Sequence, residues 1–167
     1  VSASDVRPAA KENVESLGAS FVAVEDEEFQ QAETAGGYAK EMSDEYKQKQ
    51  AELIASTVAK QDIVICTALI PGRPAPVLVS AEMVKTMRPG SVLVDLAAEQ
   101  GGNCPLSVPD KTIIKDGVSI IGQTNLASAV AIDASILFAK NLLSFASLMI
   151  NQEDNQLVID IADEIIK

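Results

Sequence analysis

The sequence contains no histidine and no tryptophan, and only two of its 167 residues are cysteines. Histidine and cysteine are the usual ligands of zinc, so their scarcity argues against a metal site, and we predict none. Cys66 and Cys104 lack Cys-x-x-Cys spacing, and each lies in an apolar or glycine-rich context. We therefore expect two reduced thiols, as in a cytoplasmic type of protein.

Basic residues are also scarce. The chain has 13 lysines and arginines against 24 aspartates and glutamates, which gives a net charge of -11. A chain this acidic repels a phosphate backbone, so we exclude nucleic acid as a partner. The acidity is concentrated in residues 25–45 and 153–164. We interpret both runs as solvated surface rather than as docking segments.

Long uninterrupted hydrophobic runs are absent. The most apolar stretch, residues 118–150, is interrupted by Gln123, Asn125, Asp133, Lys140 and Asn141. These are too many polar groups for a membrane span, so we predict a buried strand followed by a long core helix at about 128–150. The chain also lacks an initiating methionine and opens within a strand signal, so we expect a fragment cut at both ends.

Strand and helix signals alternate along the chain. The predicted strands are 1–4, 20–24, 62–70, 91–97, 111–115 and 118–122, and the predicted helices are 8–17, 43–60, 80–90 and 128–150. This alternation is typical of an α/β fold with a doubly wound, mostly parallel, Rossmann-like sheet, here incomplete at both ends. The continuous apolar run at 62–70 predicts a strand that is covered on both faces.

In sheets of this kind, ligands bind at the carboxyl ends of the strands. Asp5 follows the first predicted strand, where an acid can accept hydrogen bonds from the adenosine ribose of NAD. The guanidinium of Arg7 could instead reach a phosphate. Asp5 could equally cap the helix that starts at Pro8. The glycine fingerprint that would decide, Gly-x-Gly-x-x-Gly, does not occur in the chain.

Three further segments have both a structural and a functional interpretation. Glu99 and the two glycines after Gln100 form either a plain turn or a close backbone approach to a ligand, with Glu99 as a base or a polar contact. Thr124 or Asn125 either caps the last helix or contacts a nicotinamide carboxamide. The stretch AGGYAKEM is either a solvated loop or a hinged flap whose Tyr38 stacks on a nucleotide.

Five motifs taken together resemble one family. They are SDVRPAAKE, ETAGGYAKEM, TALIPGRPAPVLV, PGSVLVDLAAEQGGNCP and GQTNLASAVAIDAS. In this order they are similar to the NAD(H)-binding domain of the proton-translocating nicotinamide nucleotide transhydrogenases, in the alpha subunit or N-terminal region. The resemblance covers nearly the whole chain. Alanine dehydrogenases share the fold and a looser version of these motifs.

The resemblance implies a function and a set of site residues. NAD(H) would bind here and NADP(H) on a separate domain, and hydride would pass directly between the two nicotinamides, so no residue of this chain would be catalytic. The cofactor-binding residues carried over by motif are Asp5, Val6, Arg7, Gly37, Tyr38, Gln50, Leu69, Asn125 and Leu126. The first three would contact the adenosine half, Gly37 and Tyr38 would belong to a mobile flap, and the last two would lie near the nicotinamide. Gln50 and Leu69 would line the nucleotide pocket.

The same resemblance implies partners and a location. The partners would be the NADP(H)-binding domain, the membrane domain and a second copy in a homodimer. The location would be the cytoplasmic side of the bacterial inner membrane, or the matrix side in mitochondria. Residues 1–127 would be a partial Rossmann domain, and residues 128–167 a helix and tail toward a missing N-terminal lobe or a partner subunit. Because the glycine-rich loop and that lobe are absent, we expect the isolated chain to be inactive and to bind NAD weakly or not at all.

Two alternatives stay open. An alanine dehydrogenase-like oxidoreductase would need acid–base groups and usually has aspartate where Glu99 stands, and the extended AGGYAKEM flap favours a transhydrogenase. A non-catalytic nucleotide-binding fragment would keep the fold without the activity.

Overall fold

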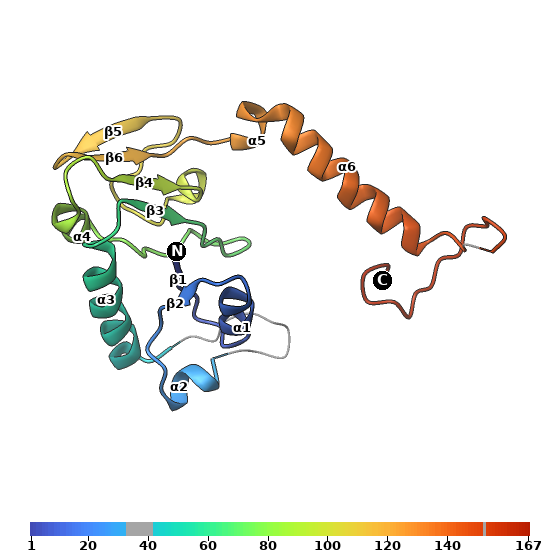
Figure 1. Cartoon of the computed structure of the whole chain (residues 1–167), viewed down its shortest axis with the longest axis horizontal. Coiled ribbons are helices and arrows are strands. Elements are labelled where there is room, and N and C mark those ends of the chain that lie inside the picture. The colour runs from blue at the N-terminus through green and yellow to red at the C-terminus, as the bar shows by residue number, and fades with distance from the viewer. Residues whose placement is uncertain (33–41, 152) are drawn as a thin grey trace. The chain divides into compact units, whose positions relative to one another are not determined.

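The computed structural model describes residues 1–32, 42–151 and 153–167 (Figure 1). The chain divides into two compact units, Val1–Thr124 and Asn125–Lys167. The first unit contains all the described strands and helices α1 to α4, and the second contains helices α5 and α6.

The first unit begins with a small parallel sheet. Strand β1 (Ser2–Ala3) pairs with strand β2 (Ser20–Phe21), and helix α1 (Ala9–Ser16) connects them. The chain leaves α1 through Gly18, whose φ of 77° lies in the left-handed region that glycine adopts without strain. The predicted strand–helix–strand order of this segment is confirmed.

The acidic run after β2 contains a short helix that the sequence did not predict. Helix α2 (Glu27–Gln30) begins where the Asp26 carboxylate accepts a hydrogen bond from the Phe29 amide at 3.0 Å. Phe29 is buried, and its ring centroid lies 6.0 Å from that of Phe21. The interpretation of residues 25–45 as solvated surface is therefore wrong for this part, because a buried aromatic anchors it.

Helix α3 (Asp44–Val58) follows, as predicted. The Ser43 hydroxyl caps it by accepting a hydrogen bond from the Tyr46 amide at 3.1 Å. Tyr46 packs in a small cluster with Phe29, near the start of the helix. Val58, at the other end, belongs to the core of the larger sheet. The helix therefore connects the two clusters of the unit.

The larger sheet has four strands in the order β3-β4-β6-β5. Their bounds are Ile63–Cys66 for β3, Val92–Asp95 for β4, Thr112–Lys115 for β5 and Val118–Ile121 for β6. Strands β3, β4 and β6 are parallel to one another, and β5 is antiparallel to β6. The hairpin between β5 and β6 turns at Asp116 and Gly117, which both have positive φ, as a tight two-residue turn requires.

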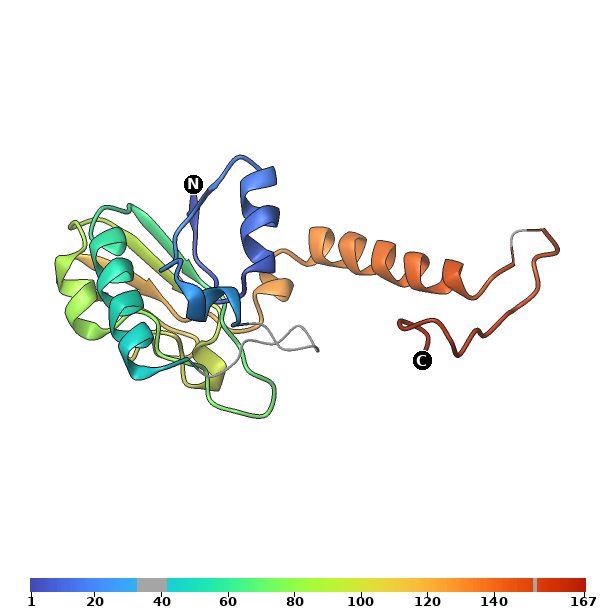
Figure 2. The same ribbon diagram turned by 90° about the horizontal axis from the view of Figure 1, so that it is seen from below.

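The mostly parallel, Rossmann-like α/β fold is confirmed, with one correction. The described strands form two sheets rather than one, because no described strand pairs β1 or β2 with the other four. Helix α4 (Ala81–Thr86), capped by the Ser80 hydroxyl, lies with α3 on one face of the four-stranded sheet (Figure 2). The buried core beneath these helices includes Val84, Leu93 and Ile120.

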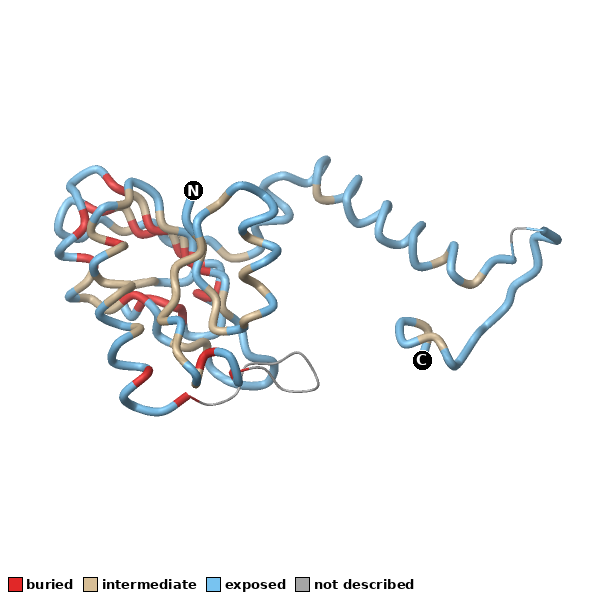
Figure 3. The backbone as a smooth tube through the Cα atoms, turned by 60° about the horizontal axis from the view of Figure 1, so that its bottom comes forward, coloured by how far each residue is buried: buried red, intermediate tan, exposed pale blue. Residues whose placement is uncertain are grey.

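The opposite face of this sheet is apolar and exposed. Ile63 and Ile65 of β3 have 64% and 62% of their surface exposed, and the register places them on the same face as Val92 and Val94. The predicted strand at 62–70 is therefore covered on one face only, because α3 and α4 both pack against the other face. Figure 3 shows the same alternation of buried and exposed positions along the strands.

The second unit is dominated by one helix. Helix α5 (Leu126–Ala129) is separated from helix α6 (Ala131–Leu148) by Val130, whose φ of -124° and ψ of 46° are not helical. No residue of α6 is buried within the described chain. The predicted long core helix is therefore wrong in two respects: it is interrupted at Val130, and the rest of its unit is a tail of turns that does not cover it.

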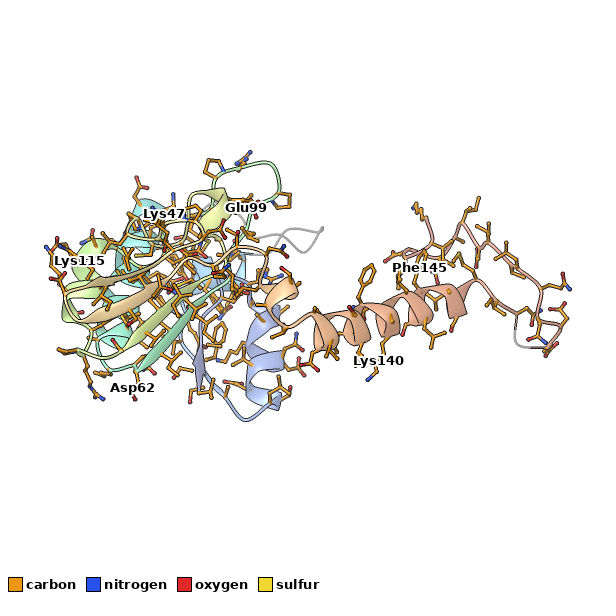
Figure 4. All side chains as sticks on the ribbon, turned by 90° about the horizontal axis from the view of Figure 1, so that it is seen from above. Lys47, Asp62, Glu99, Lys115, Lys140 and Phe145 are labelled. Atoms are coloured by element: carbon orange, nitrogen blue, oxygen red, sulfur yellow. The ribbon has the colours of Figure 1, made fainter. Side chains whose placement is uncertain are left out.

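Helix α6 is amphipathic only in part. Figure 4 shows Lys140 and Phe145 projecting from different sides of it. By length and composition it is the one helix, among the described residues, that could cross a membrane, with a mean hydropathy of 1.3. The core helix of a soluble protein meets the same criterion, so this property alone does not decide its surroundings.

Candidate functional site

The carboxyl ends of β3 and β4 lie at one edge of the four-stranded sheet, because the two strands are parallel. Two loops leave this edge: the β3 loop (residues 67–79) and the β4 loop (residues 96–107). Figure 4 shows Glu99 of the β4 loop at the other end of the sheet from Asp62 and Lys115. This edge is where the sequence predicts a ligand.

Asn103 joins the two loops. Its side chain is fully buried, and its Oδ1 accepts a hydrogen bond from the Ala68 amide at 3.0 Å. Its Nδ2 donates to the carbonyl oxygens of Ala68 and Pro76, at 2.9 and 2.8 Å. Its backbone carbonyl accepts from the Leu78 amide at 2.8 Å. One buried side chain thus holds both ends of the β3 loop against the β4 loop.

Asp95, the last residue of β4, holds the β4 loop in a similar way. Its carboxylate is fully buried, and Oδ1 accepts a hydrogen bond from the Ala97 amide at 3.0 Å. Oδ2 accepts from the Cys104 amide at 3.0 Å and from the Ser107 hydroxyl at 2.6 Å. Three donors satisfy the buried carboxylate, and the loop closes around it.

The two loops present Leu69 and Glu99 to solvent. Leu69 is 49% exposed, and Glu99 lies in the short 3₁₀ helix Ala98–Gln100. The Gln100 carbonyl accepts a hydrogen bond from the Ala75 amide at 2.8 Å, which adds a further contact between the loops. The structure therefore brings together two of the four strand-end positions expected to share an edge. An open hollow of about 620 Å³ is lined by Gly72, Arg73, Pro74, Gln100 and Gly101.

Asp5 and Arg7 form an ion pair after β1. Asp5 Oδ1 accepts hydrogen bonds from the Arg7 amide at 2.8 Å and from Arg7 Nε at 3.0 Å, and Oδ2 accepts from Nη2 at 2.8 Å. Helix α1 has no side-chain cap, so the alternative in which Asp5 caps that helix is wrong. Burial works to raise the pKa of Asp5, but the hydrogen bonds and charge of Arg7 outweigh it and lower that pKa. Val6, between them, is half-buried.

Gln50 of α3 connects that helix to the first sheet. Its side-chain oxygen accepts a hydrogen bond from the Val24 amide at 3.0 Å, and its side-chain nitrogen donates to the Ser4 hydroxyl at 3.2 Å. Ser4 directly precedes Asp5, so the structure places Gln50 beside the segment that the sequence assigned to the adenosine half. Its described contacts are structural, and a contact with nucleotide stays a prediction.

The segment after β6 differs from the expectation. Thr124 directs its amide and its hydroxyl to the Asp110 carboxylate. Asn125 has a φ of 48°, and its side chain makes no capping hydrogen bond to α5. The interpretation in which Thr124 or Asn125 caps the last helix through its side chain is therefore wrong. Leu126, the first residue of α5, is 36% exposed.

The predicted gathering of all the strand ends stays a prediction in part. Gly37 and Tyr38 lie outside the described residues. Asn125 and Leu126 belong to the second unit, and Asp5 belongs to the smaller sheet. Among the described residues, the hydrogen bonds join only the β3 and β4 loops directly.

The cysteines and acids do not gather into a metal site in the part of the chain that the structure describes. Cys66 and Cys104 are free and buried. Burial raises the pKa of the Cys66 thiol to about 12, with smaller effects from Asp95 and Cys104. The thiol is therefore neutral at physiological pH and is a poor metal ligand or nucleophile.

Sequence reasoning did not single out Asn103 or Asp95. An aspartate that ends an apolar strand, followed by Gly-Gly-Asn-Cys, carried the signal. An acid at the end of a buried strand needs local donors, and the glycine pair allows the loop to turn back to supply them.

Comparisons with known proteins agree with this arrangement. Residues 1–167 match the family model described as alanine dehydrogenase/PNT, C-terminal domain. The chain is 57% identical over 164 residues to an NAD(P) transhydrogenase alpha subunit of Rhodospirillum rubrum, and the match covers 98% of this chain and 43% of that protein.

Two solved structures are similar as well. The transhydrogenase from Sinorhizobium meliloti has a TM-score of 0.71 and 50% identity, over 99% of this chain and 42% of that chain. An L-alanine dehydrogenase has a TM-score of 0.60 and 28% identity, over 80% of this chain and 32% of that chain. The chain therefore spans less than half the length of the relatives it matches. It belongs to the alanine dehydrogenase/PNT C-terminal domain family.

Proposed function

We propose that this chain is the NAD(H)-binding part of a proton-translocating NAD(P) transhydrogenase, an enzyme that transfers hydride between NAD(H) and NADP(H). The observation that carries the proposal is the pair of loops at the carboxyl edge of the sheet, which Asn103 holds together. Parallel α/β sheets bind nucleotides at this edge. The 57% identity to a transhydrogenase subunit supports this assignment over its relatives.

The residues at hand suit a dinucleotide. The Asp5 carboxylate can accept hydrogen bonds from ribose hydroxyls while its charge disfavours a 2′-phosphate. Leu69 offers an exposed apolar side chain at the carboxyl edge of the sheet, against which a nucleotide ring can pack. Gln50 lies beside the Asp5 segment through its bond to Ser4. We assign Val6 and Arg7 to the same adenosine subsite.

The remaining contacts are proposed from the motif alone. Gly37 and Tyr38 would form a flap over the nucleotide, and Asn125 and Leu126 would lie near the nicotinamide. Glu99 would be a polar contact rather than a base.

Bound nicotinamide would supply the hydride chemistry, and the protein would supply position. Transfer between two nicotinamides needs two rings held near contact distance with water excluded, and it needs no general base. The β3 and β4 loops are rigid because Asn103 and Asp95 satisfy buried groups in both. A rigid wall keeps a bound ring in one orientation, which is the contribution that hydride transfer requires of this chain.

The proposal includes partners and a location. NADP(H) would bind on a separate domain, and a membrane domain would pass protons. We propose a peripheral position on the cytoplasmic face of a bacterial inner membrane or the matrix face in mitochondria, with the chain present in a homodimer. The exposed face of β3 and the uncovered helix α6 are apolar surfaces available for such contacts. By itself the chain would be inactive and would bind NAD weakly.

An alanine dehydrogenase activity is the second candidate, because an L-alanine dehydrogenase shares the fold. A non-catalytic nucleotide-binding fragment is the third. The test uses the intact polypeptide that carries this chain, mixed with an NADP(H)-binding domain. We expect NADH to reduce an oxidised NADP analogue in the mixture, and we expect no alanine-dependent reduction of NAD. Alanine-dependent turnover would select the second candidate, and nucleotide binding with neither activity would select the third.

A further inference from the structure

We infer that the ion pair between Asp5 and Arg7 determines which nicotinamide dinucleotide the site accepts, because Asp5 holds a guanidinium that would otherwise bind a 2′-phosphate. The inference rests on the proposed function and deepens it. It assigns to Arg7 a role opposite to its chemistry: a phosphate-binding side chain kept from phosphate by its neighbour.

The geometry of the pair supports this assignment. Arg7 uses its amide, Nε and Nη2 toward Asp5, at 2.8, 3.0 and 2.8 Å. The guanidinium therefore faces the carboxylate with the fork of donors that also fits a phosphate. The Arg7 side chain is 46% exposed and that of Asp5 is 29% exposed, so the pair is accessible to a ligand.

The carboxylate can still serve a ribose. An ionised carboxylate offers about four acceptor positions. Asp5 Oδ1 accepts two hydrogen bonds and Oδ2 accepts one from Arg7. Oδ2 therefore keeps the capacity to accept a hydroxyl, while the backbone and side-chain bonds from Arg7 hold the carboxylate in place. The pair binds a free ribose hydroxyl and, being neutral as a whole, offers no net charge to a phosphate.

The surrounding charges leave Arg7 as the group that would respond. Arg7 and Lys11 are the two basic residues in positions 1–25. Lys11 is bound to Glu25 at 2.5 Å. Loss of the Asp5 charge therefore changes the local charge at Arg7, while the Lys11–Glu25 pair stays as it is.

The test compares four forms of the intact polypeptide that carries this chain: the natural sequence, Asp5→Asn, Asp5→Asn with Arg7→Gln, and Glu25→Gln. Binding of NADH and NADPH is titrated by nucleotide fluorescence at low and high salt. Asp5→Asn keeps the shape of the side chain and removes its charge. Glu25→Gln is the matched control, because it releases a different cation in the same unit.

We expect Asp5→Asn to weaken NADH binding by about tenfold or more, and to strengthen NADPH binding by about tenfold, the size of one charge-assisted hydrogen-bond pair. The gain for NADPH should fall with added salt and vanish in the double variant. Glu25→Gln should give no comparable gain.

Three outcomes would overturn the inference: no gain for NADPH in Asp5→Asn, a gain that persists without Arg7, or an equal gain in Glu25→Gln. A folding defect cannot imitate the expected result, because the result is a gain of binding. The natural sequence tests the proposed function separately. If it binds neither nucleotide, the proposed function fails. If it binds NADH and Asp5→Asn gains nothing for NADPH, only the inference about Arg7 fails.

Discussion

Asn103 holds the backbone of Ala68 from both sides: its Oδ1 accepts from the Ala68 amide at 3.0 Å, and its Nδ2 donates to the Ala68 carbonyl at 2.9 Å. Ala68 directly precedes Leu69, the residue of the β3 loop that we assign to the nucleotide pocket. A fully buried amide on the β4 loop thus sets the position of a binding residue on another loop. Three predictions about stability concern this cluster and the smaller core, and one concerns Asp5.

Replacing Asn103 with alanine should destabilise the chain by about 2 to 3 kcal/mol, because it leaves a buried amide and two carbonyl groups without partners. The midpoint of urea unfolding should fall while the slope of the transition stays the same. Asn13→Ala is the control, because Asn13 is exposed on α1, and it should change stability by less than about 0.5 kcal/mol. Equal effects of the two substitutions would show that the bridge between the loops contributes nothing.

Gly102→Ala should be much more disruptive than Gly101→Ala. Both glycines have positive φ, 82° and 98°, so either substitution strains the backbone by roughly 1 kcal/mol. A Cβ at Gly102 would also lie 2.8 Å from Asp95 Oδ2 and 3.0 Å from the Cys104 carbonyl, whereas a Cβ at Gly101 meets nothing within 4 Å. Thermal unfolding of the two variants measures the difference. A similar melting temperature for both would contradict the close packing of the β4 loop around Asp95.

Tyr46→Phe should leave stability unchanged or raise it by up to about 1 kcal/mol. The Tyr46 hydroxyl is buried and has no hydrogen-bond partner among the described residues, so the hydroxyl is desolvated without compensation. Tyr46→Ala, which removes the ring from the cluster with Phe29, should instead cost about 3 to 5 kcal/mol. Chemical unfolding separates the two. A marked loss in Tyr46→Phe would mean that the hydroxyl has a partner in the folded chain.

Acid should remove the stabilising effect of the Asp5–Arg7 pair. Because the pKa of Asp5 is lowered in the folded chain, the pair contributes stability above the unfolded pKa of about 3.9. This contribution is lost as the pH falls through the lower folded value. Urea unfolding of the natural sequence and of Arg7→Gln should therefore differ at pH 6 and converge in strong acid. A constant difference at every pH would show that Arg7 acts through packing rather than charge.

Some of these features could be read from the sequence. Local signals decided the helix caps: Ser43 before α3 and Ser80 before α4 accept the expected amide hydrogen bonds. The meeting of Leu69 and Glu99 followed from topology, because parallel strands put their carboxyl ends together.

Other features depend on which surfaces meet, and a strand or helix pattern does not contain that information. Ile63 and Ile65 are apolar enough for a strand covered on both faces, yet α3 and α4 pack on the other side. Helix α6 is apolar enough for a core, yet its own unit leaves it exposed. Asn103 was missed because a single asparagine in a turn is common, and its importance comes from the backbone groups of Ala68 and Pro76 that only the folded chain brings to it.

The most direct test of the account is a crystal structure of the intact polypeptide with NADH bound. The account predicts the nucleotide along the carboxyl edge of the sheet, with the adenosine ribose within hydrogen-bond distance of Asp5 and a ring against Leu69. A nucleotide bound at the opposite edge, near Asp62 and Lys115, would contradict it.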